Sequence, residues 1–236
     1  MKANFVSLPK KYSFDFLMFC LRNPRPCPLL AVLSFSCIEI ARDANICTVS
    51  LADIPLYRVF KDGKMTEQES IEEYQENKLV SFLLGCSFSW EGMLTEAGTT
   101  LSISSHRNVP MYITNIPNRT SGPFGGFLVV SMRPYRPEQV PQVAAITSRF
   151  PGAHGGPIHS GDPDKIGISP DRLGQPDFGD AVTIRDGELP VFWACGVTPQ
   201  TAIMAAALPL VITHSPGHMF VTDILIEEMD IQQCST

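Results

Sequence analysis

The sequence lacks a long apolar run, a basic stretch and closely spaced cysteines, and each absence excludes a class of protein. Its most apolar stretches, residues 14–21, 80–84 and 202–212, are far shorter than the ~20 residues that span a bilayer, so we expect no membrane helix. The net charge is −6, and no Lys/Arg-rich run is interleaved with aromatic residues, so we expect no nucleic-acid partner. Polar residues interrupt the apolar run in residues 1–22 and no small-residue cleavage site follows it, which argues against export.

The seven cysteines are scattered and include no Cys-x-x-Cys pair, which argues against a zinc knuckle or a redox centre. Their odd number is typical of reduced thiols, so we expect a cytoplasmic protein. With 236 residues and 44% hydrophobic content, the chain can bury one sizeable core, or one core and a smaller lobe.

Hydrophobic periodicity predicts an α/β fold. We expect helices over residues 12–22, 66–74, 79–84, 137–150 and 199–206, with another after Ser89, and strands over residues 29–35, 56–60, 111–116, 127–132, 181–184, 191–194, 210–213 and 219–224. The alternating rhythm of the last segment favours a parallel sheet with crossover helices. We therefore expect a three-layer α/β/α main lobe formed by residues 1–110 and 190–236, and a smaller α+β lobe inserted at residues 111–189.

A strand that runs into a helix at Cys195-Gly196 is the first candidate site. Thr198 is expected as the N-cap and Pro199 as the first helical residue. The free N–H groups of such a helix start favour a carboxylate or phosphate, so Cys195, Gly196 and Thr198 are candidate substrate-binding residues. The alternative is a well-capped helix without a ligand.

The segment from Gly85 to Glu91 has a similar shape, because a glycine break is followed by hydroxyls and a helix with an acid in its first turn. Ser87 and Ser89 are candidate substrate-binding residues, and Cys86 and Glu91 are candidate catalytic residues. As the alternative, a serine caps the helix and Glu91 complements the helix dipole. Cys86 is a nucleophile only if its thiolate is stabilised, and is otherwise a buried, inert thiol.

Two histidines flank the Pro216-Gly217 turn, and the turn forbids the continuous helix of a two-histidine zinc motif. His214 and His218 could instead serve as acid and base, because imidazole transfers protons near neutral pH. Alternatively, either one is a hydrogen-bonded structural histidine.

The glycine-rich loop over residues 151–190 carries His154, His159 and Asp162, and its length favours a functional role. Its two imidazoles could approach a substrate closely; a divalent metal is the weaker interpretation, and no cofactor is otherwise expected. Further hydrogen-bond donors could hold a substrate carboxylate, although surface arginines are common. These candidate substrate-binding residues are Arg107, Asn108, Tyr112, Asn115 and Arg149.

Several motifs together resemble one family. They are Asp15-Phe16-Leu17, Arg22-Asn23-Pro24-Arg25-Pro26-Cys27-Pro28, Leu83-Leu84-Gly85-Cys86-Ser87-Phe88-Ser89, Arg107-Asn108-Val109-Pro110-Met111-Tyr112, Val130-Ser131-Met132-Arg133-Pro134, Ile146-Thr147-Ser148-Arg149-Phe150-Pro151, Pro176-Asp177-Phe178-Gly179-Asp180, and residues 191–200 and 212–223. On these motifs the chain strongly resembles, over nearly its full length, the bacterial hydro-lyases of the D-glutamate cyclase family, also called YcsI-like proteins.

The resemblance implies a lyase with two closely packed α/β lobes. The family's named activity is the cyclisation of D-glutamate to 5-oxoproline with loss of water, and the resemblance supplies no settled catalytic residues. Family members usually begin with a further segment that contains a Pro-Gly-Tyr stretch, which does not precede Asn4 here, and residues 36–50 depart from the usual acidic pattern. If the missing segment lines the site, we expect impaired function.

Three hypotheses follow. The first is a hydro-lyase that acts on a small carboxylate or amino acid, with arginines and a helix start holding the carboxylate while His214 or His218 moves protons. The second is a non-catalytic protein that senses a small carboxylate with the same groups. The third is a metal-dependent enzyme. For each we expect a homodimer, the common state of such proteins.

Overall fold

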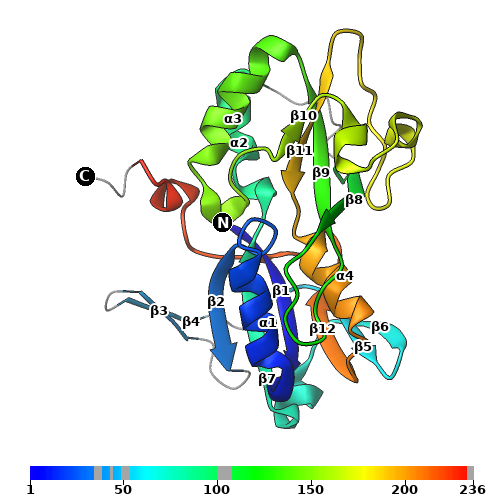
Figure 1. The fold of residues 1–236 in the computed structure, drawn as a ribbon. Coiled ribbons are helices and arrows are strands. Elements are labelled where there is room, and N and C mark those ends of the chain that lie inside the picture. Colours follow the sequence, from blue (N-terminus) through cyan, green and yellow to red (C-terminus); the bar gives the residue numbers. More distant parts are fainter. Residues whose placement is uncertain (35–38, 43–44, 49–53, 100–107, 233–236) are drawn as a thin grey trace.

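The structure, a computed structural model, describes residues 1–34, 39–42, 45–48, 54–99 and 108–232. Its strands form a larger sheet, a smaller sheet and a separate hairpin (Figure 1). In spatial order the larger sheet consists of β2 (Leu29–Ser34), β7 (Leu79–Gly85), β1 (Lys2–Pro9), β12 (Leu210–His214), β5 (Tyr57–Lys61) and β6 (Lys64–Gln68), with β13 (Phe220–Val221) beside β1. The smaller sheet consists of β10 (His159–Ser160), β11 (Leu189–Ala194), β9 (Phe127–Tyr135) and β8 (Met111–Pro117), and the hairpin of β3 (Glu39–Arg42) and β4 (Asn45–Thr48).

Four α-helices accompany these strands in the described part of the chain: α1 (Lys10–Arg22), α2 (Glu91–Glu96), α3 (Val140–Ser148) and α4 (Val197–Ala205). The prediction of an α/β fold is confirmed. The prediction of a parallel sheet is wrong, because every pair of neighbouring strands is antiparallel. Tight turns such as Asp62-Gly63, which joins β5 to β6, connect antiparallel neighbours and leave no room for a crossover helix.

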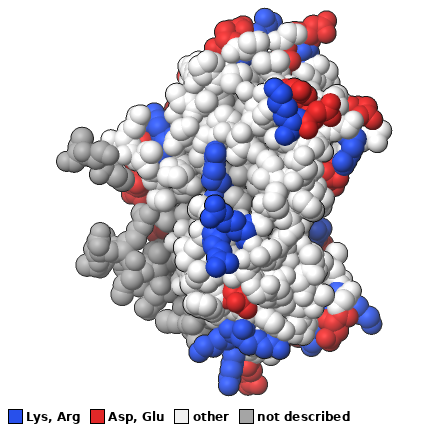
Figure 2. Space-filling view, viewed as in Figure 1, with Lys and Arg blue, Asp and Glu red and all other residues white. Residues whose placement is uncertain are grey.

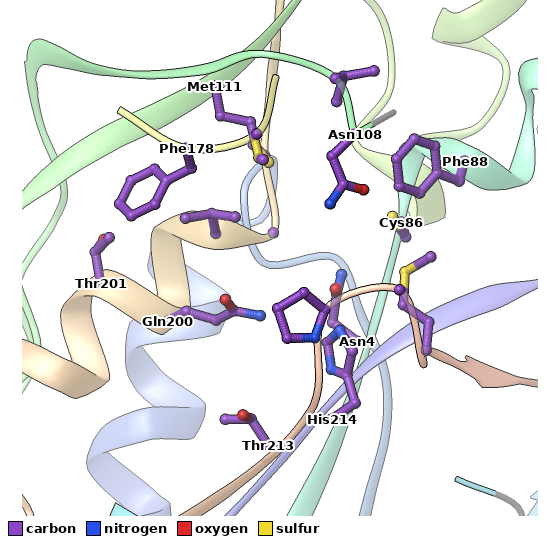
Figure 3. A pocket seen from close by; sticks show the side chains of 18 of the residues that line it. Asn4, Cys86, Phe88, Asn108, Met111, Phe178, Gln200, Thr201, Thr213 and His214 are labelled. Carbon is purple, nitrogen blue, oxygen red and sulfur yellow. The ribbon is translucent and has the colours of Figure 1, made fainter. Parts of the chain in front are cut away.

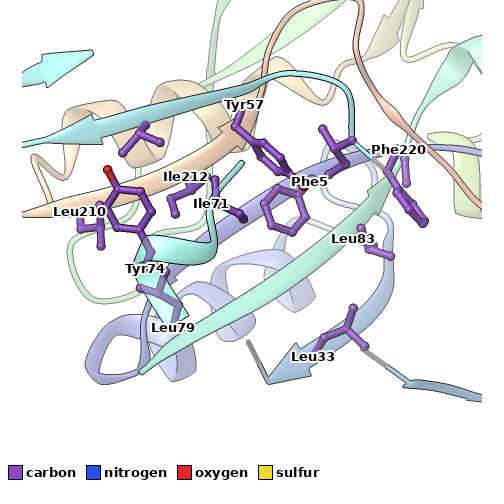
Figure 4. Packing of buried hydrophobic residues seen from close by; sticks show 13 residues of the cluster. Phe5, Leu33, Tyr57, Ile71, Tyr74, Leu79, Leu83, Leu210, Ile212 and Phe220 are labelled. Carbon is purple, nitrogen blue, oxygen red and sulfur yellow. The ribbon is translucent and has the colours of Figure 1, made fainter. Parts of the chain in front are cut away.

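Strand β1 lies inside the larger sheet and is buried on both faces. Phe5 faces one core, where its ring meets the edge of Tyr57 at 5.8 Å between centroids (Figure 4). Val6 and Leu8 face the opposite core, which α1 and α4 cover. Because side chains alternate along a strand, one short segment contributes to two hydrophobic layers.

Helix α1 was predicted correctly. The spacing of Phe14, Leu17, Met18 and Leu21 predicts that they form its apolar face, but Phe14 and Leu21 are 70% and 57% exposed. Phe16 and Phe19 are fully buried instead. Phe16 packs edge-on against Phe82 of β7 with centroids 4.8 Å apart, a contact worth about 0.5–1.5 kcal/mol beyond the buried area. Aromatic packing on the sheet therefore decides which face of the helix turns inward.

The smaller sheet is also covered on both faces. Val191 and Trp193 of β11 pack with α2 and α3, while Phe192 and Ala194 pack with the long loop that contains Ile166. That loop includes β10 but no strand over residues 181–184, so this predicted strand is wrong. Most of the loop instead forms short 3₁₀ turns and irregular backbone, as its glycine and proline content favours.

Two predicted helices are strands or turns. Residues 79–84 form β7, because a short, continuously apolar segment suits a strand that is buried on both faces. Residues 66–74 contain the end of β6 and the start of a 3₁₀ turn over Glu72–Asn77. The remaining predicted helices and strands are present, with shifted ends. Of the last strand, predicted over residues 219–224, only the two residues of β13 form a strand.

The surface carries charges of both signs. On the face shown in Figure 2, most side chains in the middle that carry a charge are basic, and basic and acidic side chains are mixed toward the two ends of the molecule. In the described residues, no helix combines the length and the apolar character that crossing a membrane requires.

Candidate functional site

A cavity of about 620 Å³ is lined by residues of both the larger and the smaller sheet. Its wall includes the residues that directly follow β7 and β11, Cys86 and Cys195, and the last residue of β12, His214. Figure 3 shows Asn4, Thr213 and His214 on one side, and Met111 and Phe178 on the other. The larger sheet thus supplies a floor, and elements of the smaller sheet supply a roof.

An interruption in the larger sheet creates this floor. Strand β12 pairs with β1 as far as Thr213 opposite Val6, and the chain then leaves the sheet and returns as β13, with Phe220 opposite Ala3. The detour contains Pro216 and Gly217, which has φ of 82°. Between the two pairings, β1 lacks a neighbouring strand on that side, and Asn4 reaches the cavity.

His214 fills the interruption with a hydrogen bond to β1. Its Nδ1 accepts from the backbone N–H of Phe5 at 3.2 Å; the Phe5 carbonyl oxygen is farther, at 3.5 Å. Because a buried N–H needs an acceptor, Nδ1 is unprotonated and the ring proton lies on Nε2. The pKa of His214 is lowered to about 4, chiefly by burial and to a smaller extent by His218 and Arg58, against the nearby Phe5 backbone, which raises it. The neutral ring offers the cavity an N–H donor.

His154 has the opposite tautomer. Its Nδ1 lies 2.7 Å from the carbonyl oxygen of Arg25, which can only accept, so the ring proton lies on Nδ1 and Nε2 holds a lone pair. The residue has φ of 75°, which turns the chain into the glycines that follow. The pKa of His154 is lowered to about 4, chiefly by burial and to a smaller extent by the charge of Arg133, against the hydrogen bond to the Arg25 backbone, which raises it. Both imidazoles on the cavity wall are therefore neutral at pH 7.

The two cysteines of the wall are thiols rather than thiolates. Burial raises the pKa of Cys86, and raises the pKa of Cys195 to about 12 in spite of hydrogen bonds from the backbone of Val197 and Gly196. Gly196 packs directly against the Asn4 side chain, where an added Cβ would lie 2.5 Å from the amide nitrogen. The charge of Arg133 lowers the pKa of both thiols, but burial outweighs it, so neither has the stabilised thiolate of a nucleophile.

A buried arginine, Arg133, contacts Ser87 of the cavity wall. The guanidinium of Arg133 is fully buried and lies 4.7 Å from the ring centroid of Trp90 and 5.6 Å from that of Trp193. It donates to the Glu91 carboxylate at 2.6 Å and to the Ser87 hydroxyl at 3.2 Å. Ser87 lines the cavity, whereas Glu91 does not, so the carboxylate neutralises a structural cation.

Several other predicted site residues lie outside the cavity. The predicted N-cap, Thr198, is wrong: Gly196 precedes the helix, and the Thr198 hydroxyl bonds instead to both the N–H and the carbonyl of Val129. The Tyr112 hydroxyl donates to the Leu173 carbonyl at 2.6 Å, and burial raises its pKa to about 12. Ser89 bonds to the backbone of Lys2.

The remaining predicted residues are tied to other parts of the surface. Arg149 pairs with Asp230 near the C-terminus, and exposed Asn115 packs beside Gly167. His159 bonds through Nε2 to the carbonyl of Asp162. The ring of His218 is exposed, with Nδ1 3.1 Å from the Pro216 carbonyl. Of the candidate residues on the Arg107-Asn108 segment, Asn108 lines the cavity and Arg107 lies outside the described residues.

Sequence reasoning missed other wall residues, among them Asn4, Phe88, Met111, Phe178, Gln200 and Met204. One signal was available for Asn4, because an amide in the middle of an apolar strand is unusual. Gln200 lies in the first turn of α4, beside the glycine that was singled out. Phe88, Met111 and Phe178 lie in motifs of the family resemblance, but their apolar side chains did not indicate a place in the site.

No three His, Cys, Asp or Glu side chains gather closely enough to hold a metal ion in the parts of the chain that the structure describes. The two histidines of the glycine-rich loop do not act together: His154 faces the cavity wall and bonds to Arg25, while His159 stacks on Phe192.

Comparison with known proteins places this arrangement in context. A family model described as D-glutamate cyclase matches residues 80–223. A Burkholderia multivorans protein named "Putative hydro-lyase" is 55% identical over 228 residues, which cover 94% of this chain and 85% of the relative. Relatives of the same name from Burkholderia ambifaria and Rubrobacter xylanophilus are 54% and 53% identical, cover the same 94% of this chain, and are themselves covered to 86% and 85%.

Proposed function

The chain belongs to the D-glutamate cyclase family of hydro-lyases, and we propose that it eliminates water from a small carboxylate or amino acid that binds in the cavity. The first substrate to test is D-glutamate, which would yield 5-oxoproline. In that reaction the amine attacks the side-chain carboxyl, a C–N bond forms, a C–O bond breaks, and the oxygen leaves as water.

One observation carries the proposal: two buried, neutral imidazoles with opposite tautomers line one cavity. Elimination of water needs a base that removes a proton from the substrate and a donor at the leaving oxygen. The lone pair on Nε2 of His154 suits the first role. The N–H on Nε2 of His214 suits the second, because a neutral imidazole can polarise an oxygen through its hydrogen bond.

The protons balance without a further group. For a hydroxy acid, the proton that His154 takes from carbon leaves with the hydroxyl as water. For D-glutamate, the ammonium group gives up two protons in turn, and His154 passes both to the carboxylate oxygen that leaves as water, so both rings are neutral at the end. A bound carboxylate also raises the pKa of a nearby imidazole, so the substrate itself makes His154 a stronger base than it is in the empty cavity.

The substrate carboxylate can be held by neutral donors. The side-chain amide of Asn4 lies on the floor near His214 and also donates to the Gly85 carbonyl at 3.3 Å. Gln200 adds a second amide from α4, whose start contributes the positive end of a nine-residue helix (Figure 3). Arg149, predicted for a carboxylate clamp, is paired with Asp230 away from the cavity, and Arg107 lies outside the described residues. Arg58 does line the cavity, but its guanidinium is paired with Glu67.

Asparagine substitutions test the roles of the two rings. The side-chain amide of His154→Asn can still donate to Arg25, and that of His214→Asn can still accept from Phe5, but both lack Nε2. We expect either variant to lose about 10²- to 10⁴-fold in kcat toward D-glutamate or a 3-hydroxy acid, with ligand affinity nearly unchanged. His218→Asn is the matched control, because that ring is exposed outside the cavity.

Three results would overturn the proposal. The first is a panel of D-glutamate and hydroxy acids that gives no turnover at high enzyme concentration. The second is full activity in both His154→Asn and His214→Asn. The third is a loss confined to His218→Asn, which would return the chemistry to the exposed ring.

A further inference from the structure

The cavity is larger and more apolar than a short amino acid requires. Its volume of about 620 Å³ falls within the range of about 300–1,000 Å³ that holds drug-sized ligands. D-Glutamate is a short chain that carries a charged group at each end, so it leaves much of this space unfilled and offers little to apolar side chains.

The apolar side chains of the cavity lie mainly on one side. Met111, Phe178 and Phe88 lie toward that side, with Asn108 among them, whereas Asn4, Gln200 and His214 lie toward the other (Figure 3). Such a division suits a ligand with one polar end and one apolar end.

Two of the apolar residues of the wall are exposed to solvent. Phe178 is 37% exposed and Met204 is 52% exposed, and both line the cavity. The backbone holds Phe178 in place, because its N–H and carbonyl both pair with Met111 of β8. Methionine is unbranched and flexible, so Met111 and Met204 can adapt to ligands of different shape.

We propose that the natural substrate is a carboxylate that carries an unbranched apolar chain. The carboxylate lies against Asn4, Gln200 and His214, and the chain lies against Phe88, Met111, Phe178 and Met204. This inference rests on the proposed function in one respect: the carboxylate end of the substrate binds at the same place in the cavity. Binding of the substrate's apolar tail requires no turnover.

Binding of straight-chain carboxylates tests the proposal without any reaction. The full chain is titrated by calorimetry with acetate, butyrate, hexanoate, octanoate and decanoate, each below its micelle concentration. We expect Kd to fall about two- to fourfold for each added methylene until the apolar part of the cavity is filled.

Matched variants locate the chain in the cavity. Phe178→Ala and Met204→Ser should flatten the dependence of Kd on chain length and leave the Kd of butyrate nearly unchanged. The controls are Phe127→Ala and Met65→Ser, because these residues are 51% and 49% exposed and lie outside the cavity. Both controls should retain the slope of the parent protein.

Each outcome decides the question. A Kd that does not change from butyrate to decanoate overturns the apolar chain and leaves the hydro-lyase proposal intact, and so does a slope that survives in the Phe178→Ala/Met204→Ser double variant. Absence of binding by every carboxylate also overturns it. A steep slope with no turnover of any hydroxy acid supports the apolar chain and overturns the hydro-lyase chemistry instead.

Discussion

Acid should destabilise the protein through the two buried imidazoles well before its carboxylates are protonated. Burial lowers the pKa of both His154 and His214 from an ordinary value of 6.5 to about 4. Between these two pH values the unfolded chain binds more protons than the folded chain, so the free energy of unfolding falls as pH falls. Below about pH 4 the loss stops growing, because the folded state then binds the same protons.

The size of the effect follows from the two pKa values. At pH 5 an unfolded imidazole is almost fully protonated and a folded one is mostly neutral, which removes about 2 kcal/mol for each ring relative to neutral pH. Two rings together remove about 4 kcal/mol, a large part of the 5–15 kcal/mol that stabilises an ordinary domain.

Urea unfolding at a series of pH values from 7.5 to 4 measures this loss. The His154→Asn/His214→Asn double variant keeps the structural hydrogen bonds but cannot titrate, so its free energy of unfolding should change about 4 kcal/mol less between pH 7 and 5. His218→Asn controls for an exposed imidazole and should follow the parent protein. Equal pH dependence in the parent and the double variant would refute the assignment of neutral, buried rings.

Three further substitutions or reactions probe the surroundings of the cavity. Gly85→Ala should destabilise the protein by about 3 kcal/mol or more, measured by urea unfolding, because its Cβ would lie 1.7 Å from the backbone oxygen of Gly152; unchanged stability would contradict this packing. Thr198→Val should cost about 1–3 kcal/mol, since it removes the hydroxyl that accepts from the buried N–H of Val129, whereas the Val129 carbonyl keeps the N–H of Cys195. Cys86 should react with thiol reagents far more slowly than a free thiol at pH 7, because burial raises its pKa, and rapid labelling would argue for a nucleophile.

Local sequence patterns correctly predicted the elements whose hydrophobic periodicity and flanking turn residues indicate the same structure. The strand over residues 191–194, the helix that follows and the strand over residues 210–213 are all present, because their periodicity and turn residues are consistent. The wrong predictions concern segments whose structure depends on contacts with distant parts of the chain. Residues 79–84 are apolar at almost every position, which suits a buried helix or a buried strand equally, and only pairing with β1 and β2 decides between them. The direction of the strands was likewise misjudged, because the helix between β11 and β12 does not connect neighbours: β11 belongs to the smaller sheet and β12 to the larger.

The location of the cavity followed partly from glycine-marked strand ends. Cys86 and Cys195 each follow a strand end next to a glycine, and both line the cavity. That inference works because a strand end near a glycine exposes backbone and brings side chains to the sheet edge. It does not identify the apolar roof, since Met111 and Phe178 resemble any other core residue until the two sheets are placed together.

The roles of the histidines could not be derived from sequence, because each tautomer is set by a distant backbone group. Phe5 is 209 positions from His214, and Arg25 is 129 positions from His154. A pair of imidazoles close in sequence, such as His214 and His218, seemed the natural acid and base, yet only one of them lines the cavity. Opposite tautomers need opposite partners, an N–H for one ring and a carbonyl for the other, and these partners come from separate segments. A complementary donor and acceptor can therefore arise only where the fold brings together an unpaired strand N–H and a loop carbonyl, as it does here at the interruption in β1 and at Arg25.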